Sequence, residues 1–399
     1  MARGEIFTAQ IESIAAGGAG IARLQGKSVF IDLTAPGDKI KCRVTKEKKA
    51  WAEAELLEVL EPSPLRKEAE CRFFGICGGC SLQHLDYEAQ IDAKTSILYS
   101  AFRRIGGIDP PAINIRRSSP YGYRNRVRFH LIHAPGRRGK TCLAFKERKS
   151  SRLVAVDDCP VADAGIRKAL KEGKFSPSVE KKSLSVYSRG NTFLFEGGQE
   201  KGKVAILDRE LAMDVKVFFQ SSAAMLELLI NDLRAAAEGA DKNLPLADVY
   251  CGVGTFSAFL GRNSEGNPEF PEADLVEENK AALALAGENM SRGVKANYFA
   301  LTDTAWVQTL LKTREEKNKK TWGFTVLDPP RDGLSGPLSN WLAQHGPDLV
   351  AYVSCDPATL ARDSRLLTDG GYVLKKLNLY DFYPQTAHIE SLAVFSREA

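Results

Sequence analysis

The sequence predicts a multidomain protein with a β-rich N-terminal domain, an α+β centre and a C-terminal α/β domain. Short apolar runs between glycine and proline turn signals fill the first sixty residues. From about residue 215 onward, strand patterns alternate with helix patterns. The length of 399 residues also exceeds what one ordinary hydrophobic core accommodates. We therefore expect domains over residues 1–62, 63–214 and 215–399.

The N-terminal domain contains four apolar runs separated by turns at Gly17-Gly18, Gly26 and residues 36–38. The runs are Ile6–Ile11, Val29–Leu33, Lys39–Val44 and Ala52–Val59. Their number and spacing predict a small five-stranded barrel of the oligonucleotide-binding kind. A linker is expected at residues 61–64, where two prolines interrupt the pattern.

The centre of the chain begins with a helical pattern over residues 86–105. Ile91, Leu98, Phe102 and Ile105 fall at helical spacing, and Gly106-Gly107 ends the pattern. We expect this helix to pack on the C-terminal domain. Residues 117–214 are expected to mix strands and loops.

Positive charge is concentrated in the centre of the chain. The formal net charge is only +5, yet residues 112–152 carry +11, with Glu147 as the single acid. Such a block is often a solvated face. The arginines alternate with three aromatic residues, Tyr121, Tyr123 and Phe129. This pattern favours a surface that binds phosphates and stacks against bases. The basic residues of the block are Arg116, Arg117, Arg124, Arg126, Arg128, Arg137, Arg138, Lys140, Lys146, Arg148, Lys149 and Arg152.

The C-terminal domain is predicted to be Rossmann-like, with a mostly parallel, doubly wound sheet of seven strands. A helix is expected over residues 278–293, between the second and third strands. The strands are expected near residues 245–250, 273–277, 297–301, 323–328, 349–354, 372–380 and 390–396.

Acidic residues follow several of these strands. The first strand runs into a Gly-x-Gly turn at 252–254, and Glu277, Asp303 and Asp328 stand at the ends of the next three. Each acid alone is compatible with a helix N-cap. Because the carboxyl ends of parallel strands share one edge, the set predicts a site for a nucleotide-like, cationic sulfonium cofactor.

Two further residues at this edge carry side chains that can take part in catalysis. Cys355 follows an apolar strand, where the alternative is a buried structural thiol. The N-terminus of the next helix is expected to increase its thiolate fraction. Glu390 lies among apolar neighbours, where it is either a base with a raised pKa or an edge residue facing water. The pattern alone leaves both alternatives open.

Several motifs resemble those of the RNA uracil-5-methyltransferase family: SCDPATLARD at 354–363, LDPPR at 327–331, DVYCGVG at 248–254, FFQ at 218–220 and QTAHIE at 385–390. Residues 17–38 resemble the TRAM domain, a small RNA-binding barrel. The likeness extends over nearly the whole chain. It implies methyl transfer from S-adenosylmethionine to carbon-5 of a uridine in ribosomal or transfer RNA.

The resemblance also implies residue roles. Cys355 would add to carbon-6 of uracil, and Glu390 would remove the carbon-5 proton. The target base would have to leave its stack to reach the site. Asp356 stands where the family more often has Asn, and we expect it to face away from the thiol. Asp303 stands where a neutral Asn also occurs. The implied cofactor residues are Gln220, Tyr250, Thr255, Glu277, Asp303 and Asp328.

A cysteine cluster precedes the helix of the central domain. Cys71, Cys77 and Cys80 form a C-x₅-C-x₂-C array, and Cys159, followed by proline, is the best candidate for a fourth ligand. Structural zinc is the generic alternative. The family resemblance implies a 4Fe–4S cluster on these four residues.

The remaining expectations concern location and partners. The N-terminus has no apolar signal segment and no long apolar run is present, so we expect a cytoplasmic protein without a membrane partner. We expect a monomer that binds RNA, ribosomal in preference to transfer RNA. Two rivals are an exocyclic-amine methylase, which has no use for Cys355, and an RNA-binding iron–sulfur protein on an inactive scaffold.

Overall fold

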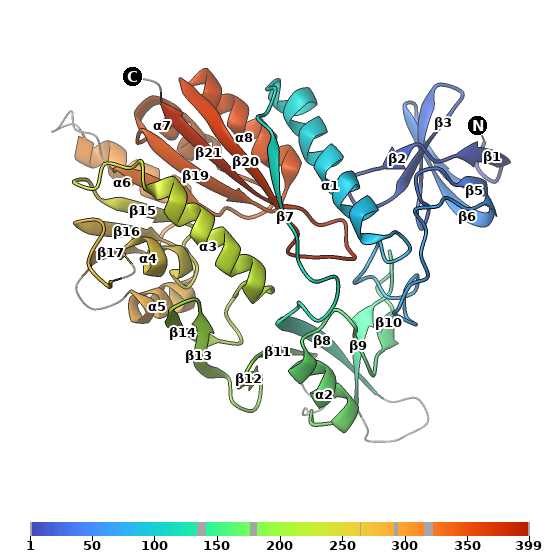
Figure 1. Ribbon diagram of the computed structural model, residues 1–399, viewed down its shortest axis with the longest axis horizontal. Coiled ribbons are helices and arrows are strands. Elements are labelled where there is room, and N and C mark those ends of the chain that lie inside the picture. The colour runs from blue at the N-terminus through green and yellow to red at the C-terminus, as the bar shows by residue number, and fades with distance from the viewer. Residues whose placement is uncertain are drawn as a thin grey trace.

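The computed structural model describes residues 2–133, 141–175, 182–263, 265–290, 294–314 and 322–397. Its helices and strands form three parts that follow one another along the chain (Figure 1). Arg137, Arg138 and Lys140 of the basic block lie outside the described residues. Among the described helices, none has both the length and the apolar character that a membrane crossing requires.

The N-terminal part is the expected small barrel. Its strands are β1 (Ile6–Gln10), β2 (Ser13–Ile14), β3 (Gly20–Leu24), β4 (Lys27–Ile31), β5 (Lys39–Glu47) and β6 (Trp51–Glu61). The strand order is β1-β5-β6-β4-β3-β2. Because β1 and β2 are successive pieces of one segment, that segment pairs with β5 at one end and with β3 at the other. The barrel therefore closes with five strand segments. Alternate residues of β5, namely Ile40, Cys42 and Val44, fill its core.

The central part is built on a five-stranded sheet in the order β10-β9-β8-β11-β12. Its elements are β8 (Arg126–His133), β9 (Thr141–Lys146), β10 (Leu153–Ala155), α2 (Ala164–Glu172), β11 (Ser183–Arg189) and β12 (Thr192–Phe195), followed by a hairpin of β13 (Lys201–Ile206) and β14 (Arg209–Asp214).

Two of the three aromatic residues expected to stack bases are buried in this part. Phe129 is 0% exposed in the core under α2, and Tyr123 is 6% exposed. Because side chains alternate across β8, Phe129 points inward while Arg128 points outward. The expectation was therefore wrong for Phe129 and Tyr123, while Tyr121 remains partly exposed.

The C-terminal part contains an eight-stranded sheet in the order β17-β16-β15-β18-β19-β21-β20-β7. All seven expected strands are present, and β21 is antiparallel to both of its neighbours. From residue 215 onward, the C-terminal part contains α3 (Ala223–Ala237), β15 (Leu246–Val249), α4 (Thr255–Leu260), β16 (Glu272–Val276), α5 (Lys280–Asn289), β17 (Lys295–Phe299), α6 (Asp303–Arg314), β18 (Phe324–Leu327), α7 (Gly336–His345), β19 (Leu349–Ser354), α8 (Pro357–Asp369), β20 (Tyr372–Tyr380) and β21 (Glu390–Arg397).

The eighth strand comes from far upstream, so the expected number of seven was one short. β7 (Ile113–Arg116) pairs in parallel with β20, at the edge of the sheet. The pairing joins residues more than 260 positions apart, such as Asn114 and Asn378. A strand of four residues carries too short a pattern to reveal such a distant partner.

Helix α1 (Tyr87–Ala101) and its π-helical continuation η1 (Phe102–Gly106) also pack on the C-terminal part (Figure 1). Asp86 caps the helix by accepting from Ala89 N at 2.9 Å. Leu98 and Phe102 are 0% exposed and belong to the same core as β18, β19 and α8. Gly106 permits close approach, since a Cβ there would lie 3.0 Å from the carbonyl oxygen of Ala361 in α8.

Candidate active site and RNA-binding surface

The turn after β15 forms the first part of the site. Tyr250 and Gly252 both adopt positive φ, and a Cβ at Gly252 would meet no atom within 4 Å, so the turn borders open space. Thr255 begins α4 directly after this turn. Glu277, after β16, accepts from the backbone N–H groups of Gly252 at 3.1 Å and of Asn279 at 2.8 Å. The turn and the acid are therefore fixed to one another.

Asp303 joins this group as the first residue of α6, which follows the neighbouring strand β17. The Tyr250 hydroxyl donates to Asp303 Oδ2 at 2.6 Å, and Ser335 N donates to the same oxygen at 3.2 Å. Burial opposes ionisation of the Asp303 carboxyl, but the hydrogen bonds from Ser335 and Tyr250 lower its pKa. Asp303 is therefore a carboxylate at neutral pH.

Asp328 follows β18 and lies beside Gln220. The Gln220 amide donates to Asp328 Oδ2 at 3.5 Å. Burial and the nearby charge of Asp248, a residue of β15, raise the pKa of Asp328 to about 7. An incoming cation would therefore stabilise its charged form.

Cys355 and Glu390 meet across two paired strands. β19 ends at Ser354, which is opposite Ser391, so Cys355 and Glu390 are the next residues on each side. Burial, Glu390 and Asp328 raise the pKa of the Cys355 thiol to about 12. Burial and Asp328 raise the pKa of Glu390 to about 8, although Arg331 opposes the shift. The sulfur and both carboxyl groups thus share one partly accessible site.

Asp356, the residue after the thiol, faces the following helix. Its carboxylate caps α8 by accepting from Ala358 N at 2.9 Å and Thr359 N at 3.0 Å. The expectation that it faces away from the thiol is therefore confirmed. The expectation that the helix N-terminus would increase the thiolate fraction was wrong, because Asp356 already uses those N–H groups and burial raises the pKa of Cys355.

Three side chains that the sequence analysis left without a role border this thiol and carboxyl pair. Arg331 Nη2 lies 3.2 Å from His388 Nδ1, and the ring of His388 lies 5.6 Å from that of Tyr383. Burial and neighbouring cations lower the pKa of His388 to about 4, so its ring is neutral and can accept from Arg331. The LDPPR and QTAHIE motifs contain Arg331 and His388, but no sequence spacing indicates that they meet.

Comparisons with known proteins identify the fold and the family. A TRAM domain model matches residues 2–57, and a tRNA (Uracil-5-)-methyltransferase model matches residues 181–398. An uncharacterized RNA methyltransferase of Treponema denticola is 34% identical over 93% of this chain and 94% of its own length. The chain belongs to the RNA uracil-5-methyltransferase family. It is an S-adenosylmethionine-dependent enzyme that methylates uracil in RNA.

Two further comparisons place this methyltransferase within the family. RlmD of Alkalilimnicola ehrlichii, a 23S rRNA (uracil(1939)-C(5))-methyltransferase, is 31% identical over 99% of this chain and 97% of its own length. The tRNA (uracil-54, C5)-methyltransferase of Pyrococcus abyssi, solved with S-adenosyl-L-homocysteine, is 23% identical and covers 98% of this chain and 100% of its own. Its TM-score of 0.72 shows that the two proteins share a fold.

The four cysteines expected to bind a metal group line one cavity of the methyltransferase. Cys71, Cys77, Cys80 and Cys159 line a cavity of about 190 Å³ between residues 71–83, called the cysteine segment, and the central sheet. Burial raises the pKa of Cys80 to about 12 and that of Cys159 to about 11. Among the described residues, no three His, Cys, Asp or Glu side chains are close enough together to hold a single metal ion.

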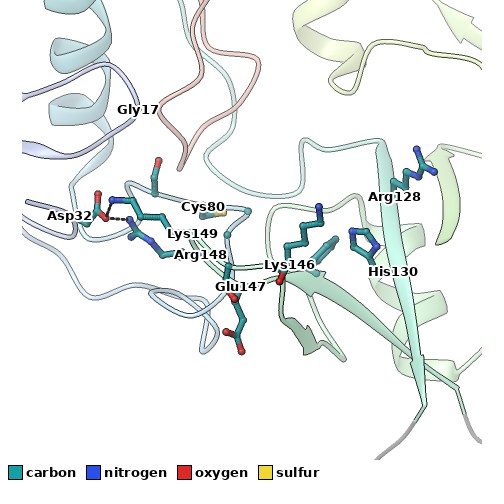
Figure 2. A pocket seen from close by; sticks show the side chains of 15 residues that line it. Gly17, Asp32, Cys80, Arg128, His130, Lys146, Glu147, Arg148 and Lys149 are labelled. Atoms are coloured by element: carbon teal, nitrogen blue, oxygen red, sulfur yellow. Dashed lines mark ion pairs between the residues drawn. The ribbon is translucent and has the colours of Figure 1, made fainter. Parts of the chain in front are cut away.

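A larger cavity of about 800 Å³ lies between the barrel and the central sheet. Figure 2 shows Arg128, His130 and Lys146 on one side of it, opposite Asp32 of the barrel. Arg148 Nη2 lies 3.0 Å from Asp32 Oδ2, and Lys149 pairs with the same carboxylate. Four residues of the basic block therefore line the junction of two domains, namely Arg128, Lys146, Arg148 and Lys149.

Some basic residues of the block lie elsewhere. Arg116, in β7, pairs with Asp232 of α3 at 2.6 Å, and Arg117 pairs with Glu88 of α1 at 2.9 Å. Arg116 thus joins β7 to α3 of the C-terminal part, whereas Arg117 joins the segment after β7 to α1. The expected basic surface is thus smaller than the charge count of residues 112–152 indicates.

Proposed function

We propose that this methyltransferase works through a covalent adduct between Cys355 and carbon-6 of the target uracil. The main support for this proposal is that Cys355 and Glu390 lie next to each other at the ends of paired strands. The same edge of the sheet holds the acids that are expected to bind the cofactor. As the thiolate adds to carbon-6, the electrons of the C5=C6 bond shift and carbon-5 becomes an enolate-like nucleophile.

Glu390 completes the reaction in this proposal. After carbon-5 has gained its methyl group, the Glu390 carboxylate takes the carbon-5 proton. The electrons of the broken C–H bond restore the C5=C6 double bond, and the C6–S bond breaks to release the Cys355 thiolate. A base with a pKa of about 8 is matched to this proton transfer near neutral pH.

We propose that the cofactor is held by side chains at the same edge, namely Gln220, Tyr250, Thr255, Glu277, Asp303 and Asp328. S-adenosylmethionine supplies the methyl group on a positively charged sulfur. Glu277, fixed by Gly252 N and Asn279 N, stands at the strand end where an acid accepts from ribose hydroxyls. The charged Asp303 and the Asp328–Gln220 pair favour a cation.

The reaction is tested with RNA that carries tritium at carbon-5 of its uridines. We expect tritium release into water to accompany methylation when S-adenosylmethionine is present, because the elimination step removes the carbon-5 proton. Cys355→Ala should abolish release, and Glu390→Gln should retain the tritium in an RNA that already carries the methyl group. Release by Cys355→Ala at the wild-type rate would contradict the proposal.

The proposed substrate is ribosomal RNA. Relatives named 23S rRNA (uracil(1939)-C(5))-methyltransferases cover this chain almost completely, at 31% and 29% identity. The transfer-RNA enzyme of known structure supports only the fold, at 23% identity. Mapping 5-methyluridine in RNA from cells with and without the gene tests this choice, and loss confined to transfer RNA would contradict it.

We propose that Cys71, Cys77, Cys80 and Cys159 hold a 4Fe–4S cluster. Four thiols that line one cavity fit such a group, because Cys thiolates are the ligands of a 4Fe–4S cluster. Methyl transfer to an activated uracil needs no electrons, so the cluster would fasten the cysteine segment to the Cys159 loop.

The cluster proposal has a direct test. Protein purified without oxygen should be brown and contain about four iron atoms per chain. Cys80→Ala should lose the colour, whereas Cys42→Ala, which changes a thiol in the barrel core, should keep it. Colourless wild-type protein with one equivalent of zinc would refute the assignment.

A further inference from the structure

The loop of residues 381–389 joins β20 to β21 and leads directly into Glu390. Figure 1 shows this loop, in red, beside the lower end of α1. Its polar side chains Asp381 and Gln385 are 0% exposed. Gln385 also adopts a φ of +70°, which is costly for a residue with a side chain. Such a conformation persists only where the surroundings fix it.

We call residues 381–389 the base loop, because they lead into Glu390, the proposed general base. Helix α1 holds this loop through two buried polar side chains. Gln90 Oε1 accepts from Gln385 N at 2.9 Å, and Gln90 Nε2 donates to Gln385 Oε1 at 3.0 Å. Lys94 Nζ donates to Asp381 Oδ1 at 2.6 Å and to the carbonyl of Tyr383 at 3.1 Å. Since buried polar groups are costly without their partners, these contacts select one geometry of the loop.

The cysteine segment holds the same loop from another side. The backbone N–H groups of Ser81 and Leu82 donate to the carbonyl of Gln385 at 3.0 and 2.9 Å. Ala387 N in turn donates to Ser81 Oγ at 3.0 Å. The residue directly after Cys80 is thus bonded to a residue three positions before Glu390.

We propose that Gln90 and Ser81 are positioning residues that hold the base loop so that Glu390 faces carbon-5. The proposal rests on the proposed role of Glu390 as the base. Neither side chain takes part in cysteine addition or methyl transfer. A displacement of about 1 Å can slow a proton transfer roughly 100-fold. Loss of these hydrogen bonds to the loop should therefore slow the final elimination more than it slows cysteine addition or methyl transfer.

The test separates these steps with unmodified substrate RNA and radiolabelled S-adenosylmethionine in single-turnover reactions. Methyl incorporation into the protein–RNA adduct and release of free methylated RNA are followed on denaturing gels. In Gln90→Met, which keeps side-chain length without hydrogen bonds, incorporation should stay within about threefold of wild type while release slows about tenfold or more. The adduct should accumulate. Ser81→Ala should show the same shift to a smaller degree.

A matched control separates positioning from loss of stability. Asn378→Leu removes another buried amide, which donates to Asp232 and Tyr380 and not to the base loop. It should leave the ratio of the two rates unchanged. If the rates of incorporation and release fall together in Gln90→Met and Ser81→Ala, the proposal is overturned. Should Gln90→Met not fold, Ser81→Ala decides alone.

Glu390→Gln distinguishes failure of this inference from failure of the proposed function. If Glu390→Gln accumulates the adduct and the positioning variants do not, Glu390 is the base and the loop contacts only stabilise the fold. If Glu390→Gln accumulates no adduct, the assignment of the base is wrong and the positioning proposal falls with it.

Discussion

Cys355 and Glu390 both have pKa values above those of exposed groups, for a shared reason. Both are removed from water and both face carboxyl groups. In the absence of ligand the pair therefore favours its neutral form. A positively charged sulfonium at the neighbouring acids would favour the thiolate and the carboxylate, so cofactor binding and nucleophile activation are expected to be coupled.

The pH dependence of the elimination step follows from Glu390. A base must be deprotonated, and the pKa of Glu390 is raised to about 8, so the rate of adduct breakdown should rise from pH 6 through pH 8 and level off about one pH unit above the pKa. Arg331 lowers this pKa, and Arg331→Ala should therefore move the rise to higher pH. Single-turnover release rates across this range check both expectations. A rate that falls with pH would contradict them.

At the residue scale, the sequence predicted which residues share one edge of the sheet better than it predicted their surroundings. The motifs contain Cys355, Glu390 and Asp328, the strand pattern indicated the other acids, and the structure brings these residues to that edge. The Arg331–His388 contact was not predictable, because it depends on the loop geometry between β20 and β21. Phe129 was misassigned because a strand of alternating basic and apolar residues was interpreted as one surface.

At the scale of single elements, Asp356 is an N-cap as well as a neighbour of the nucleophile. Asp356→Asn should preserve stability, since Asn is an equally good cap, whereas Asp356→Ala should reduce the free energy of unfolding by about 1 kcal/mol. Chemical denaturation of the two variants measures this difference. Because the carboxylate points into the start of α8, Asp356→Asn should also leave the rate of adduct formation within about twofold of wild type.

A large effect of Asp356→Asn on adduct formation, with stability unchanged, would show that the carboxylate acts on the thiol instead of on the helix.

Among the elements, the length of the apolar run determined whether the sequence predicted a strand. The seven strands of residues 215–399 were predictable because each has an apolar run bounded by turn signals. β7 was not, since four residues with a partner near the other end of the chain carry no local signal. The helix pattern over 86–105 predicted α1, while the interface with α8 and the π-helical end at Phe102–Gly106 required the structure.

At the scale of the whole molecule, the cavity between barrel and central sheet is expected to bind RNA phosphates. Lys146 is exposed at its wall, and Lys146→Ala should weaken RNA binding about 3- to 10-fold and reduce the slope of log affinity against log salt by about 1. Lys242→Ala, which removes the same charge from a lysine paired with Glu269, is the matched control. Fluorescence titrations at several salt concentrations measure both.

Equal losses in the two lysine variants would mean that net charge, and not this cavity, governs RNA binding.

Three segments of the methyltransferase meet around the base loop. The cysteine segment, α1 and β7 of the C-terminal sheet all contribute hydrogen bonds to residues 381–389. The contact of these segments with one short loop was not predictable from the sequence, because it brings together residues about 300 positions apart, such as Gln90 and Gln385.

The most direct measurement uses RNA in which the target uridine is replaced by 5-fluorouridine. Fluorine cannot leave as a proton, so after methyl transfer the enzyme should remain bound to the RNA through the sulfur of Cys355. A complex that survives denaturing electrophoresis is expected with the wild type and with Glu390→Gln, and none is expected with Cys355→Ala. The absence of any stable complex between the wild-type enzyme and its substrate RNA would contradict covalent catalysis by Cys355.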